Sequence, residues 1–314
     1  MLKALLPETW HQMFSNLSEP MHIEPYWFDP ERCIYSGVNG EDIAGLVCES
    51  ESHLDLIERC PKLRLVTFPG TGVESLLSHP KIANRQLIIC NSRDYASREV
   101  AEHTVALLLA LVKRINEGDQ LVRAGTWVDN EPWSRSLQDI SVGIVGLGDV
   151  GRQVMTLLRS MNCKIFYYSR KGETEFARQL GAIPLELNKL LAESDVVTVH
   201  LASNEETYKF IGKNEFKLMK SGSYFINTSR AAIIDTDALL DCINERQIRG
   251  AALDVFDEEP LPLGNPLQKM RNVLLSPHVG AQTPRAIFQA RLECLKNLDT
   301  FSRGSLRNVV GGHL

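Results

Sequence analysis

The chain has 314 residues, of which 44% are hydrophobic and 23% charged, and its formal net charge is −5. This composition is that of an ordinary globular protein and excludes a disordered chain, a collagen and a coiled coil. The negative net charge leaves no broad basic field for nucleic acid. No apolar run approaches the roughly 20 residues that a membrane-spanning helix needs. We therefore expect a two-domain cytoplasmic protein without nucleic-acid or membrane partners.

The seven cysteines are scattered along the chain, and none belongs to a Cys-x-x-Cys pair. A disulfide framework or a zinc site would need cysteines in clusters. We therefore expect free thiols and no metal site.

The first hundred residues have the pattern of a small α/β unit. Their candidate strands are short apolar runs separated by helix-like stretches. These runs are 43–48, 63–68 and 87–90.

One long helix is predicted over 97–117, because apolar residues lie on all sides of the helical pattern. The segment 125–136, which contains Trp127 and Trp133, has no clear period and is predicted to be a loop. The tail after Pro284 is helical again. We expect this tail to pack on the first domain, which would make that domain discontinuous.

From residue 140 onward, short apolar runs alternate with helical patterns. The runs are rich in Val, Ile, Leu and aromatic residues, and turn residues follow each of them. Such alternation predicts a parallel sheet with helices on both faces. The runs are 140–145, 164–168, 196–201, 223–228, 250–256 and 272–276.

A glycine-rich turn, GLGDVG, follows the first of these strands and leads directly into a helical pattern. In a Gly-x-Gly-x-x-Gly turn the first glycine permits the tight bend, the second lets a pyrophosphate approach the backbone, and the third lets helix and strand pack closely. The helix N-terminus adds free N–H groups and a partial positive charge. The alternative is a purely structural turn. The residues predicted to bind a dinucleotide here are Gly146, Leu147, Gly148, Asp149, Val150 and Gly151.

The end of the next strand bears on which dinucleotide binds. NAD sites usually have Asp or Glu there, which accepts hydrogen bonds from the ribose hydroxyls. Here Ser169, Arg170 and Lys171 occupy this position, so that two cations could bind a 2′-phosphate and no carboxylate would repel it. The pattern predicts NADP(H) over NAD(H), with NAD(H) left open. The alternative is a solvated basic turn without a cofactor role.

Three further polar residues each follow a predicted strand: Arg230 follows YFINTS, Glu259 follows AALDVF and His278 follows NVLLSP. In a parallel sheet they would meet at the carboxyl edge beside the cofactor. His278 is the natural acid–base group, and Glu259 could fix its tautomer. Arg230 could bind a carboxylate and polarise a carbonyl. Together they predict reversible hydride transfer to a 2-keto acid; taken singly, each could equally be a structural or surface residue.

The chain resembles the D-isomer-specific 2-hydroxyacid dehydrogenase family over nearly its whole length. Three blocks carry the resemblance: VGIVGLGDVG, INTSRAAIIDTDALLDCINERQIRGAALDVFDEEP and LLSPHVGAQT. The resemblance implies that Arg230, Glu259 and His278 form the catalytic triad. It also implies that Asp254 binds the nicotinamide carboxamide. The other residues that it places around the cofactor are Thr104, Leu201, Thr228 and Gly280.

The segment FPGTGVESLL in the first domain looks like the family's substrate loop. The backbone N–H groups of Thr71 and Gly72 would then bind the substrate carboxylate opposite Arg230. The chain departs from the family at Ala231, where Gly is usual, and at Ala202, where Pro is usual. These departures bear on the shape of the pocket more than on the type of reaction.

These features predict two Rossmann-like α/β domains. A doubly wound parallel sheet over 98–285 would bind the cofactor. A smaller flavodoxin-like substrate domain would be formed by 1–97 and 286–314. Family members are usually homodimers joined through their cofactor domains, which implies the same assembly here.

Within the family, the Ser-Arg-Lys signature resembles NADPH-dependent glyoxylate and hydroxypyruvate reductases. The resemblance implies an oxidoreductase that reduces a small 2-keto acid to the D-2-hydroxy acid. Two alternatives remain on the same fold. One is a dinucleotide-sensing binding protein such as a corepressor, and the other is a dehydrogenase of another small anion, such as formate or phosphite.

Overall fold

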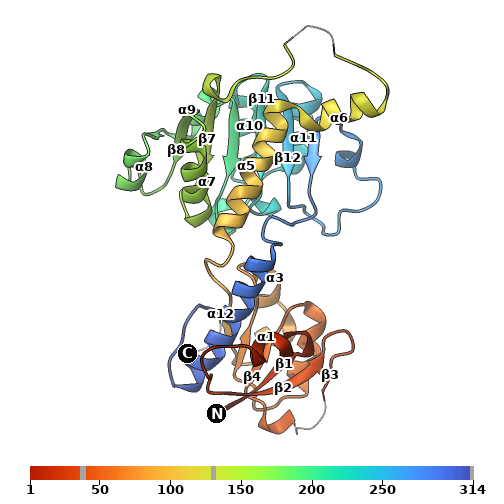
Figure 1. Ribbon diagram of the computed structural model, residues 1–314, viewed down its shortest axis with the longest axis vertical. Coiled ribbons are helices and arrows are strands. Elements are labelled where there is room, and N and C mark those ends of the chain that lie inside the picture. Colours follow the sequence, from red (N-terminus) through yellow and green to blue (C-terminus); the bar gives the residue numbers. More distant parts are fainter. Residues whose placement is uncertain (36–39, 129–131, 312–314) are drawn as a thin grey trace. The chain divides into compact units, whose positions relative to one another are not determined.

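The computed structural model describes residues 1–35, 40–128 and 132–311. The chain divides into two compact units (Figure 1). Met1–Ala96 and Thr283–Leu314 form the first, called here the two-segment unit, and Ser97–Gln282 form the second, called the 97–282 unit. The boundaries predicted from the sequence differ from these by one residue at the first crossing and by three at the second.

The 97–282 unit is built on a parallel sheet. Its strands are β7 (Ser141–Val145), β8 (Lys164–Tyr168), β9 (Ile183–Pro184), β10 (Val196–Val199), β11 (Ser223–Asn227), β12 (Ile248–Leu253) and β13 (Val273–Leu275). They lie in the order β13-β12-β11-β10-β7-β8-β9, and all these neighbours pair in parallel. The chain thus winds outward from β7 in both directions, which is the Rossmann order, with its ligand crevice where the direction reverses.

Helices cover both faces of this sheet (Figure 1). They are α5 (Ser97–Lys113), α6 (Ile115–Arg123), α7 (Asp149–Arg159), α8 (Glu175–Gln179), α9 (Leu187–Glu193), α10 (Lys213–Leu218) and α11 (Thr236–Asn244). Helices α5 and α7 pack together and share one core with the sheet, whereas α9, α10 and α11 share the other. Every residue of β7 and β10 is buried. Burial on both faces explains the nearly continuous apolar runs, and the predicted doubly wound fold is confirmed.

The helix predicted over 97–117 is broken at Arg114, which separates α5 from α6. Arg114 has a φ of 54°, in the left-handed region that interrupts a right-handed helix. Its guanidinium stacks on the ring of Trp133, 3.9 Å from the centroid, and donates to Glu117. A periodic sequence pattern cannot show this contact with a later loop. The loop predicted over 125–136 is irregular where it is described, and its residues 129–131 lie outside the described part.

The two-segment unit contains a second sheet. Its strands are β1 (Leu2–Pro7), β2 (Ile23–Asp29), β3 (Ile34–Tyr35), β4 (Gly45–Val47), β5 (Leu65–Thr67), β6 (Ile88–Cys90) and β14 (Val309–Gly311). They lie in the order β14-β6-β5-β4-β1-β2-β3, with β3 and β14 antiparallel at the edges. In chain order, the parallel strands β1, β2, β4, β5 and β6 have the 2-1-3-4-5 arrangement of flavodoxin. The flavodoxin-like expectation is thus confirmed.

Strands β1 and β2 are absent from the sequence prediction. Pro25 lies inside β2, where a proline argues against a strand because it cannot donate to the ladder. In the structure Pro25 pairs with Ala4 of β1, whereas only Phe28 and Asp29 of β2 pair with β3. In the part of the chain that the structure describes, Pro25 therefore has a strand partner on one side of β2 only, and its missing N–H is tolerated on the other side.

The helix predicted after Pro284 is α12 (Pro284–Ser302), which packs on β1 and β5 of the two-segment unit. Thr283 caps it by accepting a hydrogen bond from the N–H of Ala286. Shorter helices of this unit are α1 (His11–Ser15), α2 (Asp55–Glu58), α3 (Glu74–Leu77) and α4 (Pro80–Ala83). Within the described ranges, every helix is too short or too polar to cross a bilayer.

Candidate active site

The carboxyl ends of six neighbouring strands in the 97–282 unit lie at one level of the sheet. The residue that ends each strand pairs with the residue that ends its neighbour. Apart from Thr104 on α5, every predicted site residue of this unit comes after one of these ends, so the strand register brings their segments to one edge. The last residues of these strands, in their order across the sheet, are Tyr168, Val145, Val199, Asn227, Leu253 and Leu275.

The glycine turn lies between β7 and α7. Gly146 has a φ of +100°, and a Cβ there would lie 2.5 Å from the carbonyl oxygen of His200. A Cβ on Gly151 would lie 2.2 Å from the carbonyl oxygen of Gly146. A Cβ on Gly148, in contrast, would meet no described atom within 4 Å. Open space therefore lies over the start of α7.

This turn fits a pyrophosphate. Gly148 is the N-cap residue of α7, and no side chain in the described residues caps the helix. The first N–H groups of α7 are therefore available to an anion, and the helix dipole favours negative charge at the same point.

The basic residues after β8 have an acidic neighbour. The guanidinium of Arg170 forms an ion pair with Glu206, from the 3₁₀ helix Glu205–Thr207 that follows β10. Both side chains are mostly exposed, at 70% and 73%. The sequence-based premise that no carboxylate stands at this position is therefore wrong, because a segment 36 residues later in the chain supplies one.

The imidazole of His278 and the carboxylate of Glu259 form a hydrogen bond, with 2.7 Å between Nδ1 and Oε2. The other carboxylate oxygen of Glu259 accepts from the N–H of Phe256 at 2.9 Å. With Nδ1 bonded to Glu259, Nε2 is the nitrogen that can exchange a proton with a substrate. The two side chains are 46% and 37% exposed, so a small molecule can reach them.

The buried carboxylate of Asp254 holds the loop that carries this histidine. Its Oδ1 accepts from the N–H of Val279 at 3.0 Å and from the hydroxyl of Ser276 at 2.6 Å. Its Oδ2 accepts from the N–H of Gly280 at 2.9 Å. His103 on α5 also contacts Oδ1, with Nε2 at 3.3 Å.

Burial alone would raise the pKa of Asp254. The hydrogen bonds from His103, Ser276 and the two backbone N–H groups outweigh burial and hold the pKa below its usual range. Asp254 therefore stays ionised and orients the loop after β13. Its role toward a carboxamide stays a prediction. Sequence reasoning missed His103 and Ser276, although His103 stands directly before Thr104 in the helix predicted over 97–117.

The backbone around Arg230 is fixed by the asparagine that ends β11. The side-chain amide of Asn227 donates to the carbonyl of Arg230 at 2.9 Å, and its oxygen accepts from the N–H of Ser229 at 3.0 Å. The hydroxyl of Ser229 donates to the carbonyl of Val199 on the neighbouring strand at 2.7 Å. The half-buried Arg230 is therefore presented from a rigid turn at the carboxyl edge.

Two threonines predicted to line the cofactor site contact each other. The hydroxyls of Thr104 and Thr228 lie 2.8 Å apart, and both residues are buried. Thr104 also bonds the carbonyl of Val100 in its own helix. This contact ties α5 to the end of β11. Leu201, also predicted for this site, is half-buried after β10.

A buried histidine lies behind the glycine turn. His200 bonds the hydroxyl of Thr198 through Nε2, at 3.0 Å, and burial lowers its pKa to about 3. It is therefore neutral at physiological pH and supports the turn through its backbone. Sequence reasoning did not identify it.

The predicted substrate loop belongs to the two-segment unit and follows β5, at the carboxyl edge of that sheet. The side-chain amide of Asn91 donates to the carbonyl of Thr71 at 2.9 Å, and the N–H of Ser92 donates to the carbonyl of Gly70 at 3.1 Å. The loop is thus held by the segment after β6. The carboxylate-binding role of Thr71 and Gly72 stays a prediction.

Comparisons with known proteins agree with this fold. Residues 105–280 match the family model of the D-isomer specific 2-hydroxyacid dehydrogenase, NAD binding domain. The chain is 36% identical to a glyoxylate reductase of Thermococcus litoralis over 259 residues, which covers 80% of this chain and 78% of that protein. It is 35% identical to a glyoxylate reductase of Aeropyrum pernix over 260 residues, covering 80% and 77%.

Among solved structures, the fold is similar to a D-isomer specific 2-hydroxyacid dehydrogenase from Xanthobacter autotrophicus Py2 in complex with NADPH and MES. The TM-score is 0.78 at 23% identity, and the match covers 99% of this chain and 98% of that one. The family model covers more than half of the chain, and the first relative shares over a third of the aligned residues. The chain belongs to the D-isomer specific 2-hydroxyacid dehydrogenase family.

Proposed function

We propose that the protein reduces a small 2-keto acid of the glyoxylate or hydroxypyruvate type to the D-2-hydroxy acid, with NADPH as the hydride donor. The observation that carries this proposal is the hydrogen bond between His278 and Glu259, at the same sheet edge as the glycine turn. The relatives named glyoxylate reductase support the substrate class. Arg170 and Lys171 support the preference for NADPH.

In the proposed reaction, His278 donates a proton from Nε2 to the oxygen of the substrate carbonyl. The carboxylate of Glu259 stabilises the imidazolium through Nδ1 before the proton leaves. Arg230 binds the substrate carboxylate and polarises the carbonyl, because its planar fork suits a carboxylate. The N–H groups of Thr71 and Gly72 bind the same carboxylate. The bound cofactor supplies the hydride that C2 receives.

The cofactor would be held along the carboxyl edge of the 97–282 unit. Gly148 and the start of α7 would bind the pyrophosphate, and Arg170 and Lys171 the 2′-phosphate. Glu206 opposes the latter contact, because it is already paired with Arg170 and carries negative charge. The preference for NADPH is therefore expected to be moderate.

We also propose a homodimer joined through the 97–282 units. The exposed apolar residues of α6, Ile115 and Val122, are each 58% exposed, and Trp127 just beyond is 80% exposed. Such a group on the surface is typical of an interaction face. Light scattering is expected to give about twice the chain mass of 35.2 kDa, and a monomer at micromolar concentration would contradict the dimer.

A spectrophotometric screen tests the proposed activity. Glyoxylate, hydroxypyruvate, pyruvate and phenylpyruvate are each offered with NADPH and with NADH. The proposal expects the fastest oxidation of NADPH with glyoxylate or hydroxypyruvate. Binding of NADPH without turnover of any keto acid would favour a dinucleotide-sensing protein. Reduction of the oxidised cofactor by formate or phosphite would favour a dehydrogenase of those anions.

A further inference from the structure

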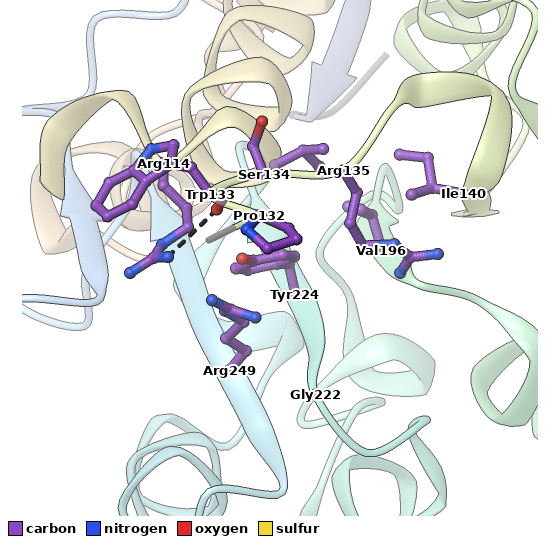
Figure 2. Close-up of a pocket in the computed structure, with 11 residues that line it drawn as sticks. Arg114, Pro132, Trp133, Ser134, Arg135, Ile140, Val196, Gly222, Tyr224 and Arg249 are labelled. Atoms are coloured by element: carbon purple, nitrogen blue, oxygen red, sulfur yellow. Dashed lines mark hydrogen bonds between the residues drawn. The ribbon is translucent and has the colours of Figure 1, made fainter. Parts of the chain in front are cut away.

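A pocket of about 150 Å³ lies at the amino edge of the sheet in the 97–282 unit (Figure 2). The candidate active site lies at the opposite, carboxyl edge of the same sheet. The starts of β10, β11 and β12 contribute to it, as do the junction of α5 with α6 and the segment 132–135. Its polar and aromatic lining includes Arg114, Trp133, Arg135, Tyr224 and Arg249.

Three arginines line the pocket together with Tyr224. Burial is the largest influence on the pKa of Tyr224 and raises it; the charges of Arg249, Arg114 and Arg135 lower this pKa, while the charge of Glu117 raises it. All three arginines are therefore close enough for their charges to act on the phenol. Figure 2 shows the side chains of Arg114 and Arg249 converging beside the ring, with the guanidinium of Arg135 directed away.

The arginines differ in how far their charge is already neutralised. Arg114 is paired with Glu117, and its guanidinium also donates to a backbone carbonyl. Arg135 is paired with Asp195. Among the described residues, no carboxylate lies within ion-pair distance of Arg249, whose side chain is exposed. The three arginines of the pocket are thus paired with only two carboxylates, those of Glu117 and Asp195. The lining of the pocket therefore carries an excess of positive charge.

A β-bulge places Arg249 at the pocket. Ser223 of β11 pairs with Ile248 of β12, but Tyr224 pairs with Gly250, so that Arg249 is the extra residue between them. Bulges of this kind redirect a side chain out of the regular alternation of a strand. The cation beside the tyrosine therefore follows from the backbone of β12.

We propose that this pocket binds a small oxyanion, the phosphate or carboxylate group of a small molecule. Arg249 binds its oxygens, the charge of Arg114 adds to the attraction, and the hydroxyl of Tyr224 donates a further hydrogen bond. The planar guanidinium fork matches the geometry of both groups, and hydrogen bonds between ions are stronger than neutral ones. This site is separate from the position expected for the cofactor 2′-phosphate, which lies after the carboxyl end of β8.

The proposal is tested by calorimetric titration of the full chain with inorganic phosphate and, separately, with citrate, at an ionic strength held constant with sodium chloride. Saturable binding of either oxyanion is expected. The substitution Arg249→Gln should weaken it about tenfold, which is the effect of losing one charge-assisted hydrogen bond. Tyr224→Phe should also weaken it, without any change of charge. The matched control is Arg159→Gln, at an exposed arginine of α7, which should leave it unchanged.

The basic turn after β8 is the main competing site for phosphate. The double substitution Arg170→Gln with Lys171→Gln should therefore leave the binding in place. Binding of phosphate alone identifies a phosphate ligand, binding of citrate alone a carboxylate ligand, and both outcomes support the site. The proposal is overturned if neither oxyanion binds saturably, if Arg249→Gln binds as tightly as the unchanged protein, or if the double substitution abolishes binding.

Discussion

The Nδ1 atom of His278 lies 2.7 Å from the Oε2 atom of Glu259. The two residues follow neighbouring strands, β13 and β12, which end at the same level because Leu275 pairs with Leu253. This relationship fixes the imidazole with one nitrogen bonded to a carboxylate and leaves the other for proton transfer. The proposed chemistry depends on this pair.

Replacing His278 with Ala should lower kcat with glyoxylate or hydroxypyruvate by about 10²- to 10⁴-fold, the usual contribution of a positioned acid–base group. Binding of NADPH, measured by fluorescence, should change little. His22→Ala, at an exposed histidine of the other unit, is the control and should keep full activity. A kcat close to that of the unchanged enzyme would contradict the role of His278.

Replacing Arg230 with Lys should raise KM for the keto acid and lower kcat together. Lysine keeps the charge, but it cannot bind a carboxylate with a planar fork or polarise the carbonyl with the same geometry. Arg159→Lys serves as the control. If steady-state kinetics showed both constants unchanged, the substrate would be held by other groups.

Replacing Glu206 with Gln removes a negative charge that repels the 2′-phosphate of NADPH. The binding of NADPH should become roughly two- to fivefold stronger, because the repulsion between exposed charges is modest. Binding of NADH should be unaffected. Calorimetric dissociation constants for both cofactors check this, with Glu205→Gln as the neighbouring control. An equal effect on both cofactors would mean that Arg170 and Glu206 do not contact the 2′-phosphate.

Stability should fall in mild acid because of His200. Its pKa is lowered from 6.5 to about 3 in the folded protein. The unfolded chain therefore takes up a proton below pH 6.5, which the folded protein cannot bind until about pH 3. The stability that neutral His200 contributes is complete above pH 6.5 and is lost as the pH falls, by roughly 1 kcal/mol per pH unit within this window.

Urea unfolding of the protein and of His200→Asn between pH 4 and pH 7 measures this effect. The slope of unfolding free energy against pH should be smaller in the variant by about that amount. Parallel curves for the two proteins would show that His200 is not buried and neutral.

Much of the 97–282 unit could be predicted from the sequence, because strands buried on both faces are continuous apolar runs between turns. The glycine turn and the segments after the strands follow from the same pattern. The two-segment unit was harder to predict, since β2 contains Pro25 and β1 is a short run ending at Pro7. The break at Arg114 also escaped prediction, because a tertiary contact with Trp133 accompanies it.

Contacts between distant segments explain the site residues that the sequence did not predict. Glu206 reaches Arg170 from the connection after β10, and His103 reaches Asp254 from α5. No local pattern contains both members of either pair. Strand order and register are needed to bring them together, and these become known only with the fold.

The most direct test of the account is chiral analysis of the product formed from hydroxypyruvate and NADPH deuterated at the transferred C4 position. The proposed mechanism predicts D-glycerate with deuterium at C2, formed by the unchanged enzyme and only in trace amounts by His278→Ala. A product of L configuration, product without deuterium, or equal yield from His278→Ala would contradict it.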